Sequence, residues 1–148
     1  MKKTSALLLA TVLCISLTAC SGVKKEKVVN DKGEKITVTY VTKATPSKFE
    51  PFEKALKEKG YTFTSKDKDA TIISGAVKSK MYILNDNRSI EIYQFDINSE
   101  AYKEAVIANK IHMSYGEKGV DLNTVFNDEY AIIPANDKEL TGIFSSLE

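Results

Sequence analysis

Apolar and polar residues alternate most clearly in the middle of the chain, where they predict a β-hairpin. Residues 81–84 and 89–95 are rich in β-branched and aromatic side chains, and the turn at 85–88 is rich in Asn and Asp. Residues 71–77 are expected to lead into this hairpin with a bend at Gly75. Residues 61–64 alternate in the same way and predict a further short strand.

A helical period first occurs after Pro46. The helix begins either at Ser47, which is spaced from Glu50 as in a capping box, or at Pro51, which suits a first helical position. Gly60 is expected to end it. In both alternatives the apolar residues of the segment lie on one face.

Two more helices are predicted in the second half of the chain. One is capped by Asn98 or Ser99, and the other starts after Asn136. Their inward positions recur at helical spacing: Tyr102, Ala105, Val106 and Asn109 in the first, and Leu140, Ile143, Phe144 and Leu147 in the second. Between them, residues 111–115, 120–126 and 130–133 predict strands, with turns at 116–119 and 127–128.

The order helix, strands, helix, strands, helix predicts an α+β fold. We expect an antiparallel sheet with about three helices packed mainly on one face, an order that two helix-plus-hairpin units would also satisfy. Residues 46–148 would form this globular domain. Residues 28–45 form either a hairpin, with its turn at 30–33, or an extended linker.

The N-terminal 19 residues have the organisation of a signal peptide. Lys2 and Lys3 precede an uncharged, mostly apolar run at residues 5–17, which is too short to span a bilayer comfortably. Leu17, Thr18, Ala19 and Cys20 follow it: an aliphatic residue, two small residues and a cysteine. This segment resembles the lipobox of bacterial lipoproteins.

That resemblance implies a lipid-anchored protein. In lipoproteins the cysteine thiol receives a diacylglyceryl group and the signal peptide is cut before it, here between Ala19 and Cys20. Two acyl chains hold a protein stably at a membrane. The expected location is the outer face of a bacterial cell membrane, and the Lys-, Asn- and Ile-rich composition favours a Gram-positive organism. The mature domain resembles small uncharacterised lipoproteins of such bacteria.

Cleavage would remove Cys14, so that the lipidated Cys20 would be the last cysteine and no disulfide framework or cysteine metal site is expected. The chain has 21 basic and 20 acidic side chains, and loss of Lys2 and Lys3 leaves 19 against 20. Without a basic excess, nucleic-acid binding is not expected. Residues 20–27 are predicted to be a polar tether whose lysines either touch lipid headgroups or are solvated.

Candidate chemistry in the mature chain is sparse. His112 is the only histidine, and Ser114 would share a strand face with it, but no third group is placed to orient the imidazole. The sequence therefore predicts no catalytic set, no metal site and no cofactor. Four aromatic residues on predicted strands are candidates for a binding surface: Tyr82, Tyr93, Phe95 and Tyr115. Of these, Tyr93 and Phe95 lie opposite a core face formed by Ile90 and Ile92 and need cover from a loop or a partner.

These observations favour a non-catalytic binding or interaction domain held at the membrane, whose partner is an unidentified envelope protein or ligand. Two alternatives stay open. The first is an envelope hydrolase with an unusual site, which would gather His112, Ser114 and a carboxylate in a deep pocket. The second is a small-ligand carrier or sensor, which would line a cavity with the tyrosines.

Overall fold

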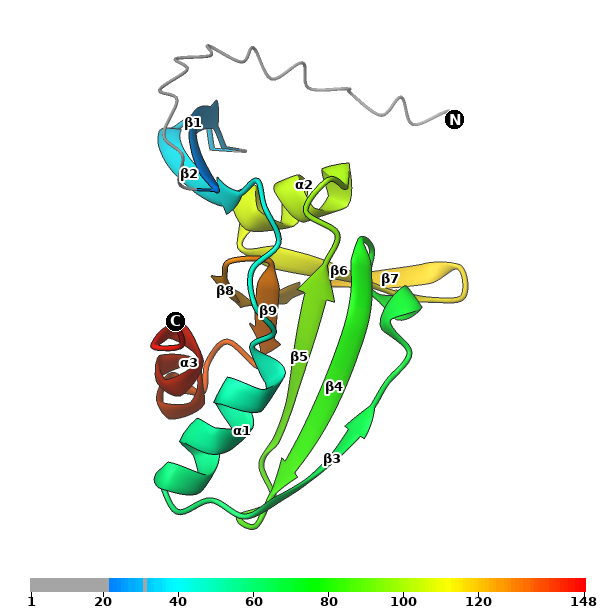
Figure 1. The fold of residues 1–148 in the computed structure, drawn as a ribbon. Helices are drawn as coiled ribbons and strands as arrows, with labels where there is room; N and C mark the ends of the chain where they lie inside the picture. Colours follow the sequence, from blue (N-terminus) through cyan, green and yellow to red (C-terminus); the bar gives the residue numbers. More distant parts are fainter. Residues whose placement is uncertain (1–21, 31) are drawn as a thin grey trace.

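The computed structural model describes residues 22–30 and 32–148, which form an α+β fold as predicted (Figure 1). The signal-peptide and lipobox residues 1–20 lie outside the described residues. The elements are, in chain order, β1 (Val23–Val29), β2 (Lys35–Val41), α1 (Phe49–Glu58), β3 (Phe63–Asp67), the short 3-10 helix η1 (Ala70–Ile72), β4 (Ala76–Leu84), β5 (Ser89–Phe95), α2 (Glu100–Ala108), β6 (Lys110–Tyr115), β7 (Lys118–Asn123), β8 (Val125–Asn127), β9 (Tyr130–Ile133) and α3 (Lys138–Ser145).

The centre of the fold is a five-stranded antiparallel sheet in the order β3-β4-β5-β9-β8. The β4–β5 hairpin is the one that the alternating pattern predicts, and its register places Tyr82 opposite Ile90. Ile92 lies between Lys80 and Ile132 of the neighbouring strands. Because side chains alternate along a strand, the even-numbered residues of β5 face one side of the sheet and the odd-numbered residues face the other.

Helices α1 and α3 cover the first face of the sheet and lie side by side (Figure 1). Their buried residues pack with the first face in one apolar cluster: Phe52, Leu56, Leu140, Ile143 and Phe144 against Tyr82, Leu84, Ile90, Ile92, Tyr130 and Ile132. Edge-to-face ring contacts join Phe52 to Tyr82 and to Phe144. The core is therefore built where the helical and strand periods predicted apolar faces.

The third helix packs on the other side. Helix α2 buries Tyr102 and Ala105 against Tyr93 and Phe95 of β5, and Ile111 of β6 completes this second cluster. Strand β2 and η1 also contribute to it. Two helices share one face, as expected, but the β6–β7 hairpin that follows α2 forms a two-stranded sheet of its own, so two equivalent helix-plus-hairpin units do not describe the fold.

The strand predicted at 120–126 is in fact two strands in different sheets. Strand β7 pairs with β6, whereas β8 pairs with β9 in the main sheet. Between them Thr124 is buried, its hydroxyl donates to the Ile132 carbonyl at 2.7 Å, and its backbone N–H donates to Asn109 at 3.1 Å. These contacts hold the chain where it crosses from one sheet to the other.

The polar tether predicted at 20–27 is also corrected, because β1 begins at Val23 and pairs with β2 over its whole length. The hairpin alternative for residues 28–45 is therefore right, but the hairpin starts five residues earlier. Its turn uses Asn30, whose side-chain oxygen accepts hydrogen bonds from the backbone N–H groups of Lys32 and Glu34. Gly33, with φ of 79°, supplies the left-handed position of the turn.

The helix starts follow the sequence signals in two of three cases. Ser99 caps α2 and Asp137 caps α3, each accepting a hydrogen bond from a backbone N–H in the first turn. Helix α1 begins at Phe49, and neither Ser47 nor Pro51 sets its start. Its cap position is Lys48, which makes no side-chain cap and instead pairs with Asp128.

Candidate functional site

A groove of about 810 Å³ lies between the tip of the β1–β2 hairpin, the last turns of α2 and the β6–β7 hairpin. Asn30 and Ile36 line it from the β1–β2 hairpin, Glu104 and Ala108 line it from α2, and His112 lines it from β6. Helix α2 ends beside the groove at Asn109, which adopts the left-handed conformation typical of a helix C-terminus. The wall of the groove therefore mixes charged, amide and aliphatic groups.

The His112 imidazole lies at one wall of the groove and contacts the carboxylate of Asp121 at 2.8 Å. The two residues are direct cross-strand partners in the β6–β7 hairpin. Gly119 packs against the imidazole so closely that a Cβ there would lie 2.3 Å from Nε2. The side chains of His112 and Asp121 are 52% and 60% exposed, so water screens the pair and it contributes little to stability.

Asp121 does not stand out from the sequence when the turn is placed at 116–119. The turn has two residues, with Gly116 at φ 58°, and Tyr115 pairs directly with Lys118. Glycine with positive φ followed by one further residue is a typical two-residue hairpin signal. This shorter turn would have placed His112 opposite Asp121 from the sequence alone.

The groove has part of the arrangement that a hydrolase using His112 would need. His112 and Asp121 both line it, and so does Ser74, whose backbone N–H donates to the His112 carbonyl at 3.2 Å. Ser114, the predicted neighbour on the strand, is exposed and is not among the groove residues. Among the described residues, Asp121 is the side-chain partner that the structure gives the His112 imidazole.

The binding surface predicted from four aromatic residues is wrong for three of them. Tyr82, Tyr93 and Phe95 are buried, because helices cover one face of the sheet and α2 with β6 covers the other. Burial raises the pKa of the Tyr82 and Tyr93 hydroxyls, and each hydroxyl donates to a glutamate. Tyr115 is 61% exposed, and none of the four lines the groove.

A buried ion pair fastens α1 to the β8–β9 turn. Lys48 is only 2% exposed, and its ammonium lies 2.9 Å from the carboxylate of Asp128 and 3.4 Å from the carbonyl of Leu147. Asp128 has φ of 55° in the turn, and Asn127 beside it donates to the carbonyls at the end of α3. The turn therefore holds the start of one helix and the end of another.

A second buried charge, Glu129, holds the segment between β2 and α1. Its carboxylate accepts hydrogen bonds from the backbone N–H and the hydroxyl of Thr45 at 2.9 and 2.8 Å. The neighbouring Tyr102 hydroxyl donates to the carbonyl of Asp128 at 3.1 Å, and burial raises the pKa of Tyr102 to about 12. No sequence pattern marks these residues, because their partners are far away along the chain. They position the β1–β2 hairpin that forms one side of the groove.

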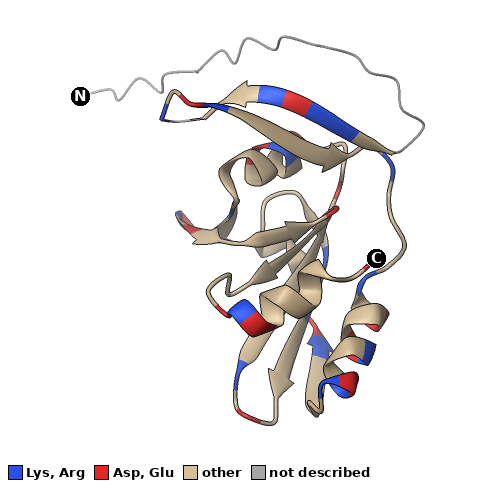
Figure 2. Cartoon of the chain, turned by 90° about the vertical axis from the view of Figure 1, so that its left-hand side faces the viewer, with Lys and Arg blue, Asp and Glu red and all other residues tan. Residues whose placement is uncertain are grey.

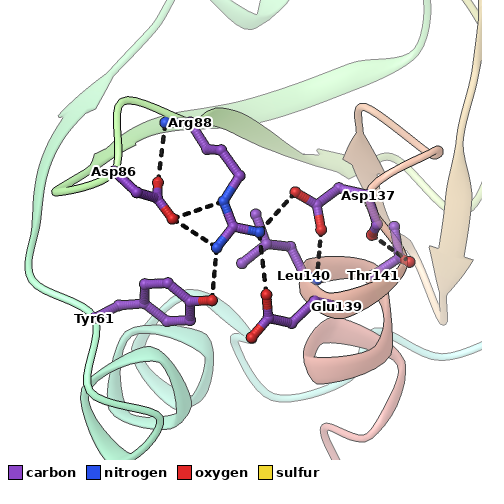
Figure 3. A network of polar contacts seen from close by, with 7 residues as sticks. All are labelled: Tyr61, Asp86, Arg88, Asp137, Glu139, Leu140 and Thr141. Atoms are coloured by element: carbon purple, nitrogen blue, oxygen red, sulfur yellow. Dashed lines mark hydrogen bonds and ion pairs between the residues drawn. The ribbon is translucent and has the colours of Figure 1, made fainter.

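A polar network at the opposite end of the sheet surrounds Arg88, the only arginine in the sequence (Figure 3). Its guanidinium donates to Asp86 at 2.8 Å, to Asp137 at 3.0 Å, to Glu139 at 3.2 Å and to the Tyr61 hydroxyl at 2.6 Å. These partners come from the β4–β5 turn, from the start of α3 and from the segment after α1. The network joins three segments and leaves no free donor directed at a ligand, so its role is structural.

Residues 22–30 and 32–148 contain no group of three or more His, Cys, Asp or Glu side chains placed to hold a metal ion. None of their helices combines the length and apolar character needed to cross a membrane. Comparison of the chain with protein-family models, with curated proteins and with solved structures finds no match.

Proposed function

We propose that this protein is a bacterial lipoprotein that acts as a non-catalytic binding protein on the outer face of the cell membrane. The signal-peptide pattern and the lipobox at Leu17–Cys20 support the anchor, with cleavage before Cys20 and a diacylglyceryl group on its thiol. The observation that carries the binding role is the groove between the β1–β2 hairpin, α2 and the β6–β7 hairpin.

The composition and size of the groove suit recognition. Its volume of about 810 Å³ lies in the usual range for sites that take a small molecule or a short peptide segment. Glu104 and Lys110 supply opposite charges, and Asn109 supplies an amide donor and acceptor. Apart from the His112 imidazole, the groove residues that the structure describes carry charged, amide, hydroxyl and aliphatic side chains, so a polar segment of a partner fits the groove well.

The contact between His112 and Asp121 is the observation that favours a second candidate function, an envelope hydrolase. In that function the imidazole would act as a general base for a water or hydroxyl brought by the substrate. The two functions differ in a direct test. His112→Ala would abolish hydrolysis completely, whereas in a binding protein it would weaken the complex without removing a reaction.

The groove can be tested in intact cells with a photo-crosslinking amino acid at Lys110, and at Lys54 on α1 as the control. We expect one partner to be captured from Lys110 and not from Lys54. Ala108→Trp, which fills the groove, should abolish this capture, whereas Ala135→Trp, in a separate hollow of about 560 Å³ near the end of β9, should not. Equal capture by both Trp variants would exclude the groove as the binding site.

A further inference from the structure

The β1–β2 hairpin has two faces of different character. The fold covers the inner face, and among the outward positions of the two strands it buries only Val41, at the end of β2. Val38 and Tyr40 on β2 are buried in the cluster that α2 and β6 complete. Their cross-strand partners, Glu26 and Lys24, therefore lie on the same inner face. The Lys24 ammonium is 3.6 Å from Glu26 and 5.8 Å from the centre of the Tyr40 ring, so the inner face satisfies its own charges.

The outer face carries the remaining lysines of the two strands. Lys25 and Lys27 of β1 are opposite Thr39 and Thr37 of β2, Lys35 is opposite Val29, and the three lysines are exposed. None of the outward positions of these two strands is acidic, because the only acid within either strand, Glu26, faces inward. Figure 2 shows the basic residues along β1, at the end of the molecule farthest from the β4–β5 turn.

Two exposed valines flank the basic positions. Val23 is 43% exposed and Val29 is 55% exposed. Because side chains alternate along a strand, both lie on the same face of β1 as Lys25 and Lys27. We define the outer face of the hairpin as Lys25, Lys27 and Lys35 with Val23, Val29 and Thr37. Lysines beside small apolar side chains suit the boundary between headgroups and acyl chains, where the ammonium meets phosphate and the apolar groups leave water.

We propose that the outer face of the hairpin docks on a membrane surface that carries anionic phospholipid headgroups. The attraction is local, because the sequence as a whole has a net charge of only +1. A soluble anion would use the lysines alone, whereas a lipid surface uses the lysines and the valines together. The inference depends on the hairpin only and does not require lipid on Cys20 or a ligand in the groove.

Docking in this way would fix the orientation of the molecule. Ile36, which lines the groove, lies on the inner face of the hairpin because it is opposite Val28. The groove then opens on the side of the hairpin that does not contact the membrane. The turn between β4 and β5, which contains Arg88, would point away from the surface (Figure 1).

An environment-sensitive fluorophore on the outer face tests the docking directly. In the full chain with Cys14→Ser and Cys20→Ser, Thr37→Cys provides a single site for the label, and Lys54→Cys on α1 is the control site. Mixed phosphatidylglycerol and phosphatidylcholine vesicles should shift the emission of the Thr37→Cys label to the blue and leave the Lys54→Cys label unchanged. High salt should reverse the shift, because the Debye length falls to about 3 Å at 1 M.

Substitution of the lysines measures how much each contributes to docking on the anionic vesicles. Each of Lys25→Gln, Lys27→Gln and Lys35→Gln should lower the docking constant about fivefold, and all three together roughly a hundredfold. A matched triple variant on exposed lysines elsewhere, Lys57→Gln, Lys59→Gln and Lys66→Gln, should leave docking unchanged.

Three results would overturn the proposal: no shift with the anionic vesicles, an equal shift with pure phosphatidylcholine vesicles, or equal release by soluble polyphosphate at the same phosphate concentration. The neutral vesicles also control for the apolar run at residues 5–17, which would bind any bilayer. Loss of partner capture from the groove would leave this result untouched, so the two proposals fail separately.

Discussion

Lys48 is a residue at which burial and charge are directly opposed. An ammonium that is 2% exposed is stabilised by Asp128 at 2.9 Å, and the loss of one partner from such a pair leaves an uncompensated charge in a poorly hydrated site. The carboxylate of Asp128 is 33% exposed and can be rehydrated more easily. The energetic cost of breaking the pair should therefore depend on which side is removed.

Asp128→Asn should lower the free energy of unfolding by about 3 kcal/mol, because it leaves the Lys48 ammonium unpaired while asparagine still accepts the left-handed backbone. Lys48→Met removes the buried charge and keeps an apolar stem, so its cost should be about 1 kcal/mol or less. Urea unfolding at neutral pH measures both. Equal losses for the two variants would show that the ammonium is not desolvated as the structure indicates.

Ser99 offers a second prediction at the scale of one residue. Its hydroxyl accepts a hydrogen bond from the Tyr102 backbone N–H at 3.1 Å and also donates to the Asp96 carbonyl. Ser99→Ala should reduce stability by about 1 kcal/mol, the usual cost of losing an N-cap. Asn98→Ala is the matched control and should be nearly neutral, since the sequence alone left both residues as candidates. A larger loss for Asn98→Ala would contradict the assigned cap.

The elements are joined by networks that reach across the sequence, and the Arg88 network is the most connected. It ties the β4–β5 turn to the N-terminus of α3. Hydrogen bonds from the Arg88 side chain and backbone hold the pKa of Asp86 below its ordinary value. A carboxyl with a lowered pKa in the folded state stabilises the fold while it is ionised in both states.

This gives a prediction for pH dependence. The contribution of Asp86 should be fully present above the pKa of an unfolded aspartate, about 3.9, and should be lost as the pH falls through its lower folded pKa. Asp86→Asn should therefore destabilise the protein at neutral pH, and the difference from the wild type should shrink in acid. In an Arg88→Gln background the effect of Asp86→Asn should be much smaller at every pH. An undiminished effect there would exclude Arg88 as its cause.

Most elements could be predicted because their signals are local. The alternation at 81–84 and 89–95, the stripe from Leu140 to Phe144 and the cap Ser99 all act within a few residues. The split at Thr124 could not be predicted in this way. It depends on hydrogen bonds to Asn109 and Ile132, which only the assembled sheets bring near.

The site was less predictable than the fold because it also depends on contacts between segments that are distant in the sequence. The strand pattern does not show what packs on the sheet face that contains Tyr93 and Phe95. That face is covered by α2 and β6, which lie later in the sequence. The groove is formed by segments from three parts of the chain, so no single motif marks it. His112 was recognised as the one histidine, but its partner Asp121 depends on the length of one turn.

At the scale of the whole molecule, the proposals place the charged hairpin at the membrane and the groove beside it. The lipid on Cys20 would supply most of the binding strength, because a diacylglyceryl group carries two acyl chains. The outer face of the hairpin would mainly orient the domain on the membrane and would add little to the strength of membrane binding. A protein arranged in this way presents its groove within a short distance of the membrane, where envelope proteins and exported segments are found.

The mature N-terminus is the measurement that tests this account most directly. We predict that mass spectrometry of the protein extracted from cell membranes will show a chain that begins at Cys20 and carries a diacylglyceryl group on that residue. Cys20→Ala should lack the modification and lose this processing. A membrane-extracted chain that retains residues 1–19, or that has a free thiol at Cys20, would contradict the proposal that the protein is a lipoprotein.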